Sequence, residues 1–341
     1  MLEPQVVLNA LEETAGNQSA AARLLQVPRT TFRKAVKRID TAEAIEKNAL
    51  DFPELPEDDI PVDQIIDQMS RRFTRRQQAY RARQWMKYKV KDKKPIGIAW
   101  VGDPHVDSNG CNWPLLREHC RIMADTPGLY GASIGDHTDN WVGRLTRLYA
   151  ESEQSRSTAI KLCDWLLRDS GVNWMLLLRG NHDMWTNEKK DDPIFWISHS
   201  LKVPLEDWAA RITLEFPNGR EARVHAAHNF KGHSMWNSLH GAQKQAHMKD
   251  QAHLYVAGHT HNWALHQEES ASREFTYWLA RARGYKFLDD YADLLGHSPQ
   301  EGGATILSVF DSNAKTDSAM VQCFADLEAG ADYLTWARAK K

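Results

Sequence analysis

The sequence predicts an α/β protein that carries a small all-helical unit at its amino end. From residue 95 onward, short apolar runs typical of buried strands alternate with longer amphipathic segments typical of helices. Residues 4–38 instead hold three short helical segments separated by turn signals. The chain is 42% hydrophobic and 26% charged, as an ordinary soluble fold is. It has no apolar run of about 18 residues that could cross a membrane.

The amino-terminal segment has the pattern of a helix-turn-helix. Pro4 can open a first helix, and Gly16 helps to end it. A second short helix is expected over 20–25, followed by a tight turn. A third helix begins at Pro28 or at the next residue and runs to Arg38. Two short helices joined by a turn of three or four residues are the defining feature of this motif.

Charge is unevenly distributed along the chain, although the net charge is only −2. Residues 17–38 contain six basic residues and no acidic one, 41–70 contain nine acidic residues and one lysine, and 71–94 contain eleven basic residues and one aspartate. Such segregation usually concerns a partner rather than the fold. We therefore expect a helix-turn-helix unit, an acidic proline-containing linker that is largely extended or disordered, a basic aromatic helix with a lead-in to the first strand, and a large α/β domain, at residues 1–40, 41–68, 69–94 and 95–341.

The same patterns place the elements of the large domain. Asn218-Gly219 between two apolar runs is a strong signal for a hairpin turn. Strands are expected at 96–101, 130–134, 174–178, 211–216, 222–227, 254–257, 263–267, 275–280, 304–310 and 319–324. Helices are expected at 114–125, 152–169, 191–201, 241–251 and 332–339.

Five short polar segments each follow one of the apolar runs. Because the carboxyl ends of neighbouring strands can face one crevice, we expect these segments to converge. Carboxylate, imidazole and amide groups suit Mn²⁺, Fe or Zn²⁺, and a pair of such ions suits hydrolysis of phosphate esters. The segments are Asp103-Pro104-His105, Gly135-Asp136, Gly180-Asn181-His182-Asp183, His228 and Gly258-His259-Thr260-His261.

The order of these segments resembles the calcineurin-like metallophosphoesterase superfamily, in a phage or prophage form, over about residues 95–324. The resemblance implies an αββα sandwich, in which two mixed sheets are flanked by helices. It also implies a hydrolase with two divalent metal ions, Mn²⁺ first, with Fe, Zn²⁺ or Ni²⁺ as alternatives. The implied ligands are Asp103, His105 and His261 for one ion, Asn181, His228 and His259 for the other, and Asp136 as a bridge between both.

Three further residues near these ligands have expected roles. By the same resemblance, His182 faces the substrate and protonates the leaving alkoxide. Asp183 either orients that imidazole or caps the start of a helix. His137 either hydrogen-bonds phosphate or lies behind the ligands or at the surface.

The fourth strand leaves a choice of histidine ligand. Strand alternation puts His225 and His228 on opposite faces of the sheet. His228 stands where the apolar run gives way to a polar loop, so we expect it to be the ligand. His225 and His233 are the alternatives.

Residues 16–34 resemble the helix-turn-helix of the Fis type. In such units the third helix enters the major groove of DNA, and a helical docking module is the alternative. Gln26 stands where this turn commonly has glycine, and a left-handed backbone costs other residues about 1 kcal/mol or more. The residues expected to face DNA are Arg29, Thr30, Thr31, Arg33 and Lys34.

Two more basic groups have two interpretations each. The aromatic residues of the second basic stretch either stack on nucleic acid or pack on the large domain, and they are Phe73, Tyr80, Trp85 and Tyr88. A later group either contacts phosphate near the metals or forms a solvated cluster, and it comprises Arg281, Arg283 and Lys286.

The combined features predict a metal-dependent phosphodiesterase that hydrolyses DNA, a nuclease. Asp139 stands where a purple acid phosphatase has tyrosine, which argues against that class. GNHD in place of GNHE favours the nuclease and nucleotide-phosphodiesterase branches of the superfamily. The alternatives are an enzyme for nucleotides or small phosphoesters, and a DNA-binding regulator with a weakly active phosphatase fold. With no signal-peptide pattern and four cysteines without a CxxC pair, we expect a cytoplasmic protein, with DNA as partner, no membrane contact and a homodimeric state.

Overall fold

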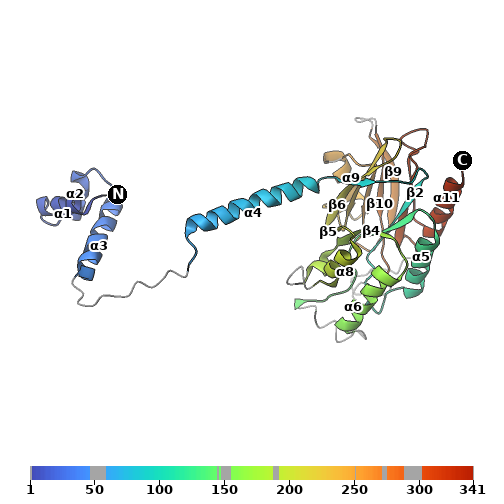
Figure 1. The fold of residues 1–341 in the computed structure, drawn as a ribbon, viewed down its shortest axis with the longest axis horizontal. Coiled ribbons are helices and arrows are strands. Elements are labelled where there is room, and N and C mark those ends of the chain that lie inside the picture. Colours follow the sequence, from blue (N-terminus) through green and yellow to red (C-terminus); the bar gives the residue numbers. More distant parts are fainter. Residues whose placement is uncertain are drawn as a thin grey trace. The chain divides into compact units, whose positions relative to one another are not determined.

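A computed structural model describes residues 2–46, 59–143, 146, 155–186, 192–249, 251–270, 275–287 and 302–340, without the side chains of 41–46. The chain divides into two compact units, Met1–Arg72 and Phe73–Lys341 (Figure 1).

The amino-terminal unit contains a bundle of three helices, α1 (Pro4–Glu13), α2 (Gln18–Leu24) and α3 (Arg29–Glu46). Asn17 caps α2, because its side chain accepts hydrogen bonds from the backbone N–H groups of Ser19 and Ala20. The predicted helical unit is therefore confirmed. Its core consists of Val7, Ala10, Ala21, Ala22, Phe32 and Val36.

The prediction of an extended or disordered acidic linker over residues 41–68 is wrong at both ends of that range. Helix α3 continues to Glu46, where the sequence alone suggested an end at Arg38, and α4 (Val62–Ala82) begins before residue 69. Residues 42–46 include alanine and glutamate, which are good helix formers, so the acidic composition did not prevent helix formation. The rest of the predicted linker, 47–58, lies outside the described residues.

The larger unit contains two sheets of six strands each among the described residues. The hairpin predicted at Asn218-Gly219 joins β6 and β7, which pair antiparallel. The first sheet runs in the order β1 (Met86–Lys89), β6 (Ala209–Glu215), β7 (Glu221–Ala227), β8 (Leu254–Ala257), β10 (Phe275–Arg281) and β9 (Ala264–Ser270). The second runs in the order β12 (Val321–Phe324), β11 (Thr305–Phe310), β2 (Ile96–Val101), β3 (Leu129–Ser133), β4 (Trp174–Arg179) and β5 (Leu205–Asp207).

Both sheets are mixed, as expected for this fold class. In the second sheet β2, β3, β4 and β5 run parallel and β11 is antiparallel to β2. In the first sheet β7, β8 and β10 run parallel and β9 is antiparallel to β10. Strands β1 and β5 were not predicted. β5 has only 3 residues, too few to show a pattern, whereas β1 alternates over 4 residues but lies in the basic stretch that was expected to be a helix and a lead-in to the first strand.

The two sheets face each other across one apolar core, and helices cover their outer faces. Ile98 and Trp100 of β2 point into the core between the sheets, whereas Ala99 and Val101 point to the helical side. Helices α5 and α11 lie side by side on the second sheet (Figure 1). The layers confirm the predicted αββα sandwich. Besides the end of α4, the described residues of this unit form the helices α5 (Trp113–Asp125), α6 (Arg156–Asp164) with a π-helical turn (Trp165–Asp169), α7 (Asn181–Met184), α8 (Pro193–Leu201), α9 (His240–Met248) and α11 (Leu327–Ala339).

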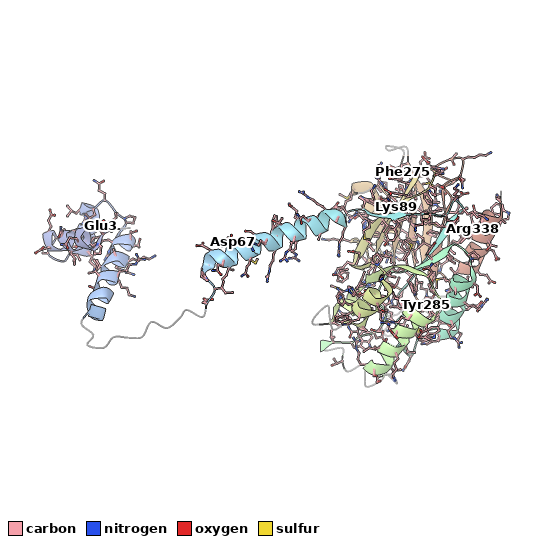
Figure 2. All side chains as sticks on the ribbon, viewed as in Figure 1. Glu3, Asp67, Lys89, Phe275, Tyr285 and Arg338 are labelled. Atoms are coloured by element: carbon pink, nitrogen blue, oxygen red, sulfur yellow. The ribbon has the colours of Figure 1, made fainter. Side chains whose placement is uncertain are left out.

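The last helix is fixed to the start of the second sheet by one arginine. Arg338 of α11 is labelled in Figure 2. It donates hydrogen bonds to the carbonyl of Pro95, at 2.6 Å, and to the carboxylate of Asp92, at 2.8 Å. This contact joins residues 243 positions apart and aligns β2, the strand that leads to Asp103.

The turn between α2 and α3 supplies a test of the stability of the helix-turn-helix. Gln26 adopts a φ of 52°, in the left-handed region that glycine occupies without a steric penalty. Gln26→Gly should therefore stabilise this unit by about 0.5–1 kcal/mol. The measurement is amide hydrogen exchange of α2 and α3 in the full chain. Gln18→Gly, inside α2, should have the opposite effect, and slower exchange in both variants would contradict the explanation.

Candidate metal centre

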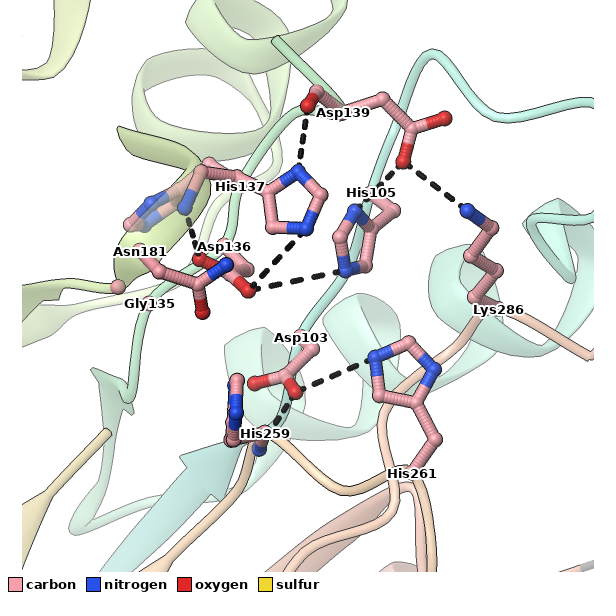
Figure 3. A network of polar contacts seen from close by, with 12 residues as sticks. Asp103, His105, Gly135, Asp136, His137, Asp139, Asn181, His259, His261 and Lys286 are labelled. Carbon is pink, nitrogen blue, oxygen red and sulfur yellow. Dashed lines mark hydrogen bonds and ion pairs between the residues drawn. The ribbon is translucent and has the colours of Figure 1, made fainter. Parts of the chain in front are cut away.

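Seven side chains converge at the ends of five strands (Figure 3). Asp103 and His105 follow β2, Asp136 follows β3 and Asn181 opens α7 after β4. The others follow the two central strands of the first sheet: His228 comes after β7, and His259 and His261 come after β8. The convergence of the five polar segments predicted from the sequence is therefore present in the structure.

One group of donor atoms surrounds Nε2 of His228. This atom lies 2.9 Å from Oδ1 of Asn181, 3.0 Å from Nδ1 of His259 and 3.3 Å from Oδ2 of Asp136. Four ligand-type atoms thus point at one another, an arrangement that a cation at their centre would stabilise.

A second group lies on the other side of Asp136. Oδ2 of Asp136 lies 4.0 Å from Nε2 of His105, and Oδ2 of Asp103 lies 3.4 Å from Nε2 of His261. The rings of His105 and His261 are 5.2 Å apart. Asp136 therefore belongs to both groups, as a bridging carboxylate must.

Contacts behind the imidazoles fix which nitrogen faces the centre. Nδ1 of His228 donates to the carbonyl of Ile134 at 2.9 Å, so Nε2 is left as a donor atom for a metal. Nδ1 of His105 lies 2.7 Å from the carboxylate of Asp139, which also accepts a hydrogen bond from Lys286 at 3.2 Å (Figure 3). These partners orient the rings before any ligand binds.

The donor set fits divalent cations. Oδ1 of Asp103 and Nε2 of His105 are buried and have no hydrogen-bond partner among the described residues. Burial opposes the charge of His228, but the carboxylates of Asp136 and Asp103 raise its pKa to about 9. Burial likewise opposes the charge of Asp103, yet His261 and His228 lower its pKa. Bound cations would neutralise the buried carboxylates of Asp103 and Asp136 and would supply the partner that Oδ1 of Asp103 lacks.

Four of the seven residues have left-handed backbones. The φ angles are 39° at His105, 53° at Asp136, 76° at His259 and 49° at His261. Each such conformation costs a residue with a Cβ about 1–2 kcal/mol, and it persists only where the surrounding structure enforces it. The sharp backbone turns direct these side chains back into the crevice.

Glycines precede the ligands because the backbone and the ligands approach too closely for a side chain. A Cβ at Gly180 would lie 2.1 Å from Oδ1 of Asp136 and 2.6 Å from the ring of His228. A Cβ at Gly258 would lie 2.7 Å from Oδ1 of Asp103. Glycine is therefore required in the GN and GH pairs because no room is left for a Cβ.

His182 lies beside the shared carboxylate. Its Nε2 is 3.9 Å from Oδ2 of Asp136, and its Nδ1 donates to the carbonyl of Asp139. The rings of Trp185 and Trp141 lie 4.1 Å and 5.0 Å from the imidazole. Burial, with a contribution from the charge of His105, lowers the pKa of His182 to about 4.

Asp183 contacts backbone rather than the imidazole of His182. Its carboxylate accepts hydrogen bonds from the backbone N–H groups of Asp136, His137 and Gly180 at 2.8–3.1 Å. The expectation that Asp183 orients His182 is therefore not met, since the carbonyl of Asp139 does so. Asp183 has the alternative role at the start of α7, and it also fixes the loop that carries Asp136.

His137 is fully buried, with its ring between Ser133 and Asp183 at 2.8 and 3.2 Å. This position does not suit the phosphate contact considered from the sequence.

His225 is also buried, and its ring packs on Phe230 and Tyr255, on the face of β7 opposite to His228. His233 is exposed in a loop. The structure thus brings His228, and not these alternatives, to the centre.

The basic residues at and just after the end of β10 are buried close to the ligand loops. Arg281, Arg283 and Lys286 are all buried, so the solvated cluster considered from the sequence is wrong. Arg281 donates to the carbonyls of Ser238 and Gly258 and to the hydroxyl of Thr260, and so holds the loop that carries His259 and His261. Arg283 lies over the ring of Phe287.

The basic residues of the helix-turn-helix are free of the core. On α3 the side chain of Phe32 is buried, whereas the residues around it are exposed, namely Arg29, Thr30, Thr31, Arg33 and Lys34.

The aromatic residues of the second basic stretch divide between the two interpretations. Trp85 and Tyr88 are partly buried on the larger unit, whereas Phe73 and Tyr80 of α4 are 67% and 68% exposed.

Comparisons with known proteins bear on both parts of the chain. Residues 1–38 match the family described as "Bacterial regulatory protein, Fis family". No curated protein matches the chain. None of the described helices is both long and apolar enough to cross a membrane.

The following three are among the solved structures that are similar to the chain. Vps29 of Entamoeba histolytica complexed with Zn²⁺ has 11% identity and a TM-score of 0.34, over 67% of this chain and 97% of its own. The NAD nucleotidase NadN of Haemophilus influenzae has 8% identity and a TM-score of 0.36, over 67% of this chain and 49% of its own. GAP50, the anchor in the inner membrane complex of Plasmodium, has 10% identity and a TM-score of 0.33, over 73% of this chain and 96% of its own. The fold assignment itself rests on the strand order and layers of this chain.

Gly180→Ala tests the close packing of the centre. The added methyl group must displace the carboxylate of Asp136 or the ring of His228, so we expect Mn²⁺ affinity to fall by at least about tenfold, by analogy with the loss of groups that orient ligands. Isothermal titration calorimetry with Mn²⁺ measures this. Gly219→Ala is the control: its Cβ meets nothing within 4 Å, although the φ of 84° strains the backbone locally, and equal affinity in both variants would refute the steric explanation.

Proposed function

We propose that the chain is a phosphodiesterase with two divalent cations and that it hydrolyses DNA. The observation that carries the proposal is Asp136, a buried carboxylate shared by two groups of donor atoms. Two groups of His and Asp among the described residues could each hold a metal ion: His105, Asp136 and His182, and Asp136, His228 and His259.

In this proposal Asp103, His105 and His261 hold one cation, and Asn181, His228 and His259 hold the other. Asp136 serves both. The resemblance favours Mn²⁺, and the donor set of oxygens and imidazoles without thiolate also suits Fe, Zn²⁺ or Ni²⁺. When bound, the cations supply Lewis acidity toward phosphate oxygens and a water of lowered pKa.

His182 is the proton donor to the leaving oxygen. The hydrogen bond from its Nδ1 to the carbonyl of Asp139 leaves Nε2 directed toward Asp136 and the space beside it. With a pKa of about 4, its imidazole is largely neutral at pH 7 without substrate. An anionic phosphate at the centre would raise this pKa and so favour the protonated form that the role requires.

The amino-terminal unit would deliver the enzyme to DNA. The match of residues 1–38 to the Fis family and the exposed basic side chains of α3 support this role. Such units commonly act in pairs, which agrees with the predicted homodimer. The complete set of seven donor residues argues against the alternative of a DNA-binding regulator with a weakly active phosphatase fold.

A nuclease assay tests the function. The chain with Mn²⁺ should cleave labelled single- or double-stranded DNA, and His182→Ala should reduce the rate by about 100- to 10,000-fold with unchanged Mn²⁺ content. His233→Ala, which removes an exposed histidine, is the matched control. Hydrolysis of bis-p-nitrophenyl phosphate without cleavage of any polymer would instead favour a small-phosphoester enzyme. Loss of Mn²⁺ with His182→Ala would contradict the assigned role.

DNA binding by α3 is tested separately from catalysis. Arg33→Ala combined with Lys34→Ala should weaken DNA binding and reduce the slope of log affinity against log salt by about 2, because two phosphate contacts are lost. Fluorescence anisotropy measures the affinity, and hydrolysis of bis-p-nitrophenyl phosphate should not change. Lys161→Ala, an exposed lysine of α6, is the control. Unchanged DNA affinity in the double variant would remove α3 from the interface.

A further inference from the structure

Helix α4 presents a row of large apolar side chains to solvent. The helix has 21 residues, none of them buried. Its exposed fractions are 70% at Val62, 55% at Ile66, 56% at Met69, 67% at Phe73 and 68% at Tyr80. Most of the stability of a helix in a protein comes from packing of its apolar face, so burial of the row against a partner would contribute much of the stability of α4.

The spacing of this row is that of a coiled coil. The steps from Val62 to Ile66, Met69 and Phe73 are four, three and four residues, and Tyr80 follows seven residues after Phe73. This is the a/d pattern of the heptad repeat, which places the residues on one seam. The seam (Val62, Ile66, Met69, Phe73 and Tyr80) is interrupted once, by Arg76 at a d position.

The charges of α4 specify how a second copy would fit. The acidic half, taken as residues 62–70, contains Asp63 and Asp67 and no basic residue. The basic half, residues 71–82, contains no acidic residue and five arginines, which are Arg71, Arg72, Arg75, Arg76 and Arg81. In a parallel pair like charges would lie together, whereas an antiparallel pair brings each acidic half to a basic half.

We propose that α4 is a dimerisation helix and that two copies of the chain pair along the seam in antiparallel orientation. In antiparallel coiled coils an a position faces a d position. The heptad then sets Val62 opposite Tyr80, Met69 opposite Phe73, and Ile66 opposite Arg76 of the second copy. The guanidinium of Arg76 would lie beside the acidic half of the second copy, and a charged group in the seam fixes register and direction.

A second copy suits this helix better than DNA does. A phosphate backbone would interact with the arginines but would leave the apolar seam uncovered and would be repelled by Asp63 and Asp67. The same sequence in a second chain covers the seam and matches both charged halves. The inference concerns assembly, so it does not depend on the proposed hydrolysis of DNA.

Light scattering after size-exclusion chromatography tests the assembly with the full chain and no DNA. The parent chain should have twice the mass of one chain, and Met69→Lys combined with Phe73→Lys should have the mass of one chain. Gln78→Lys combined with Gln64→Lys adds the same charge on the opposite face of α4 and should stay dimeric. Far-UV circular dichroism, compared with that of the parent chain, checks that the monomeric variant is folded. A parent chain with the mass of one chain overturns the proposal. The same holds if the parent chain associates only after DNA or anionic vesicles are added.

Cysteine cross-linking tests the orientation. Chains with Met69→Cys and chains with Phe73→Cys, one of them tagged, are mixed and oxidised mildly, with the parent chain as background. Antiparallel pairing predicts disulfides mainly between the two kinds of chain. Disulfides that form mainly within each kind would show a parallel pair and overturn the proposed orientation.

Discussion

The structure depends on the burial of one carboxylate, that of Asp136, among imidazole nitrogens that can each bind a proton or a cation. Asp136 lies within 3.3–4.0 Å of the imidazole nitrogens of His228, His182 and His105. Removing so many polar groups from water is unfavourable unless a cation or a proton compensates. The two sheets bring these groups together because the polar segments follow strands whose ends lie at the same edge. The centre therefore sets conditions that the rest of the domain must satisfy.

Those conditions are met by groups behind the ligands. Asp139 and Lys286 orient His105, the carbonyl of Ile134 orients His228, and Arg281 holds the loop of His259. Each contact replaces a hydrogen bond to water and also reduces the freedom of a ligand. The left-handed backbones of the site persist because these contacts over-determine them. A centre of this kind is prepared before a ligand arrives, which lowers the cost of ordering on binding.

The sequence was informative about elements and ligands and less so about their supports. The ten predicted strands are present within a few residues, because apolar runs of four to seven residues leave a clear pattern, whereas β5 with 3 residues does not. The seven candidate ligands could be found because each follows a strand. The roles of Asp139 and Lys286 could not, since they meet across 147 positions and neither belongs to a motif. Asp183 shows the same limit: its neighbour in sequence is His182, but two of its backbone partners, Asp136 and His137, lie on another loop.

The left-handed backbones at His105, Asp136, His259 and His261 have a consequence for protein engineering. Transplanting the seven side chains onto another scaffold would not reproduce the centre, because ordinary strand-to-loop connections direct them elsewhere. A designer would have to copy the torsion angles of the connections together with the amino acids. The minimal transferable unit is thus a set of five shaped loops and not a list of ligands.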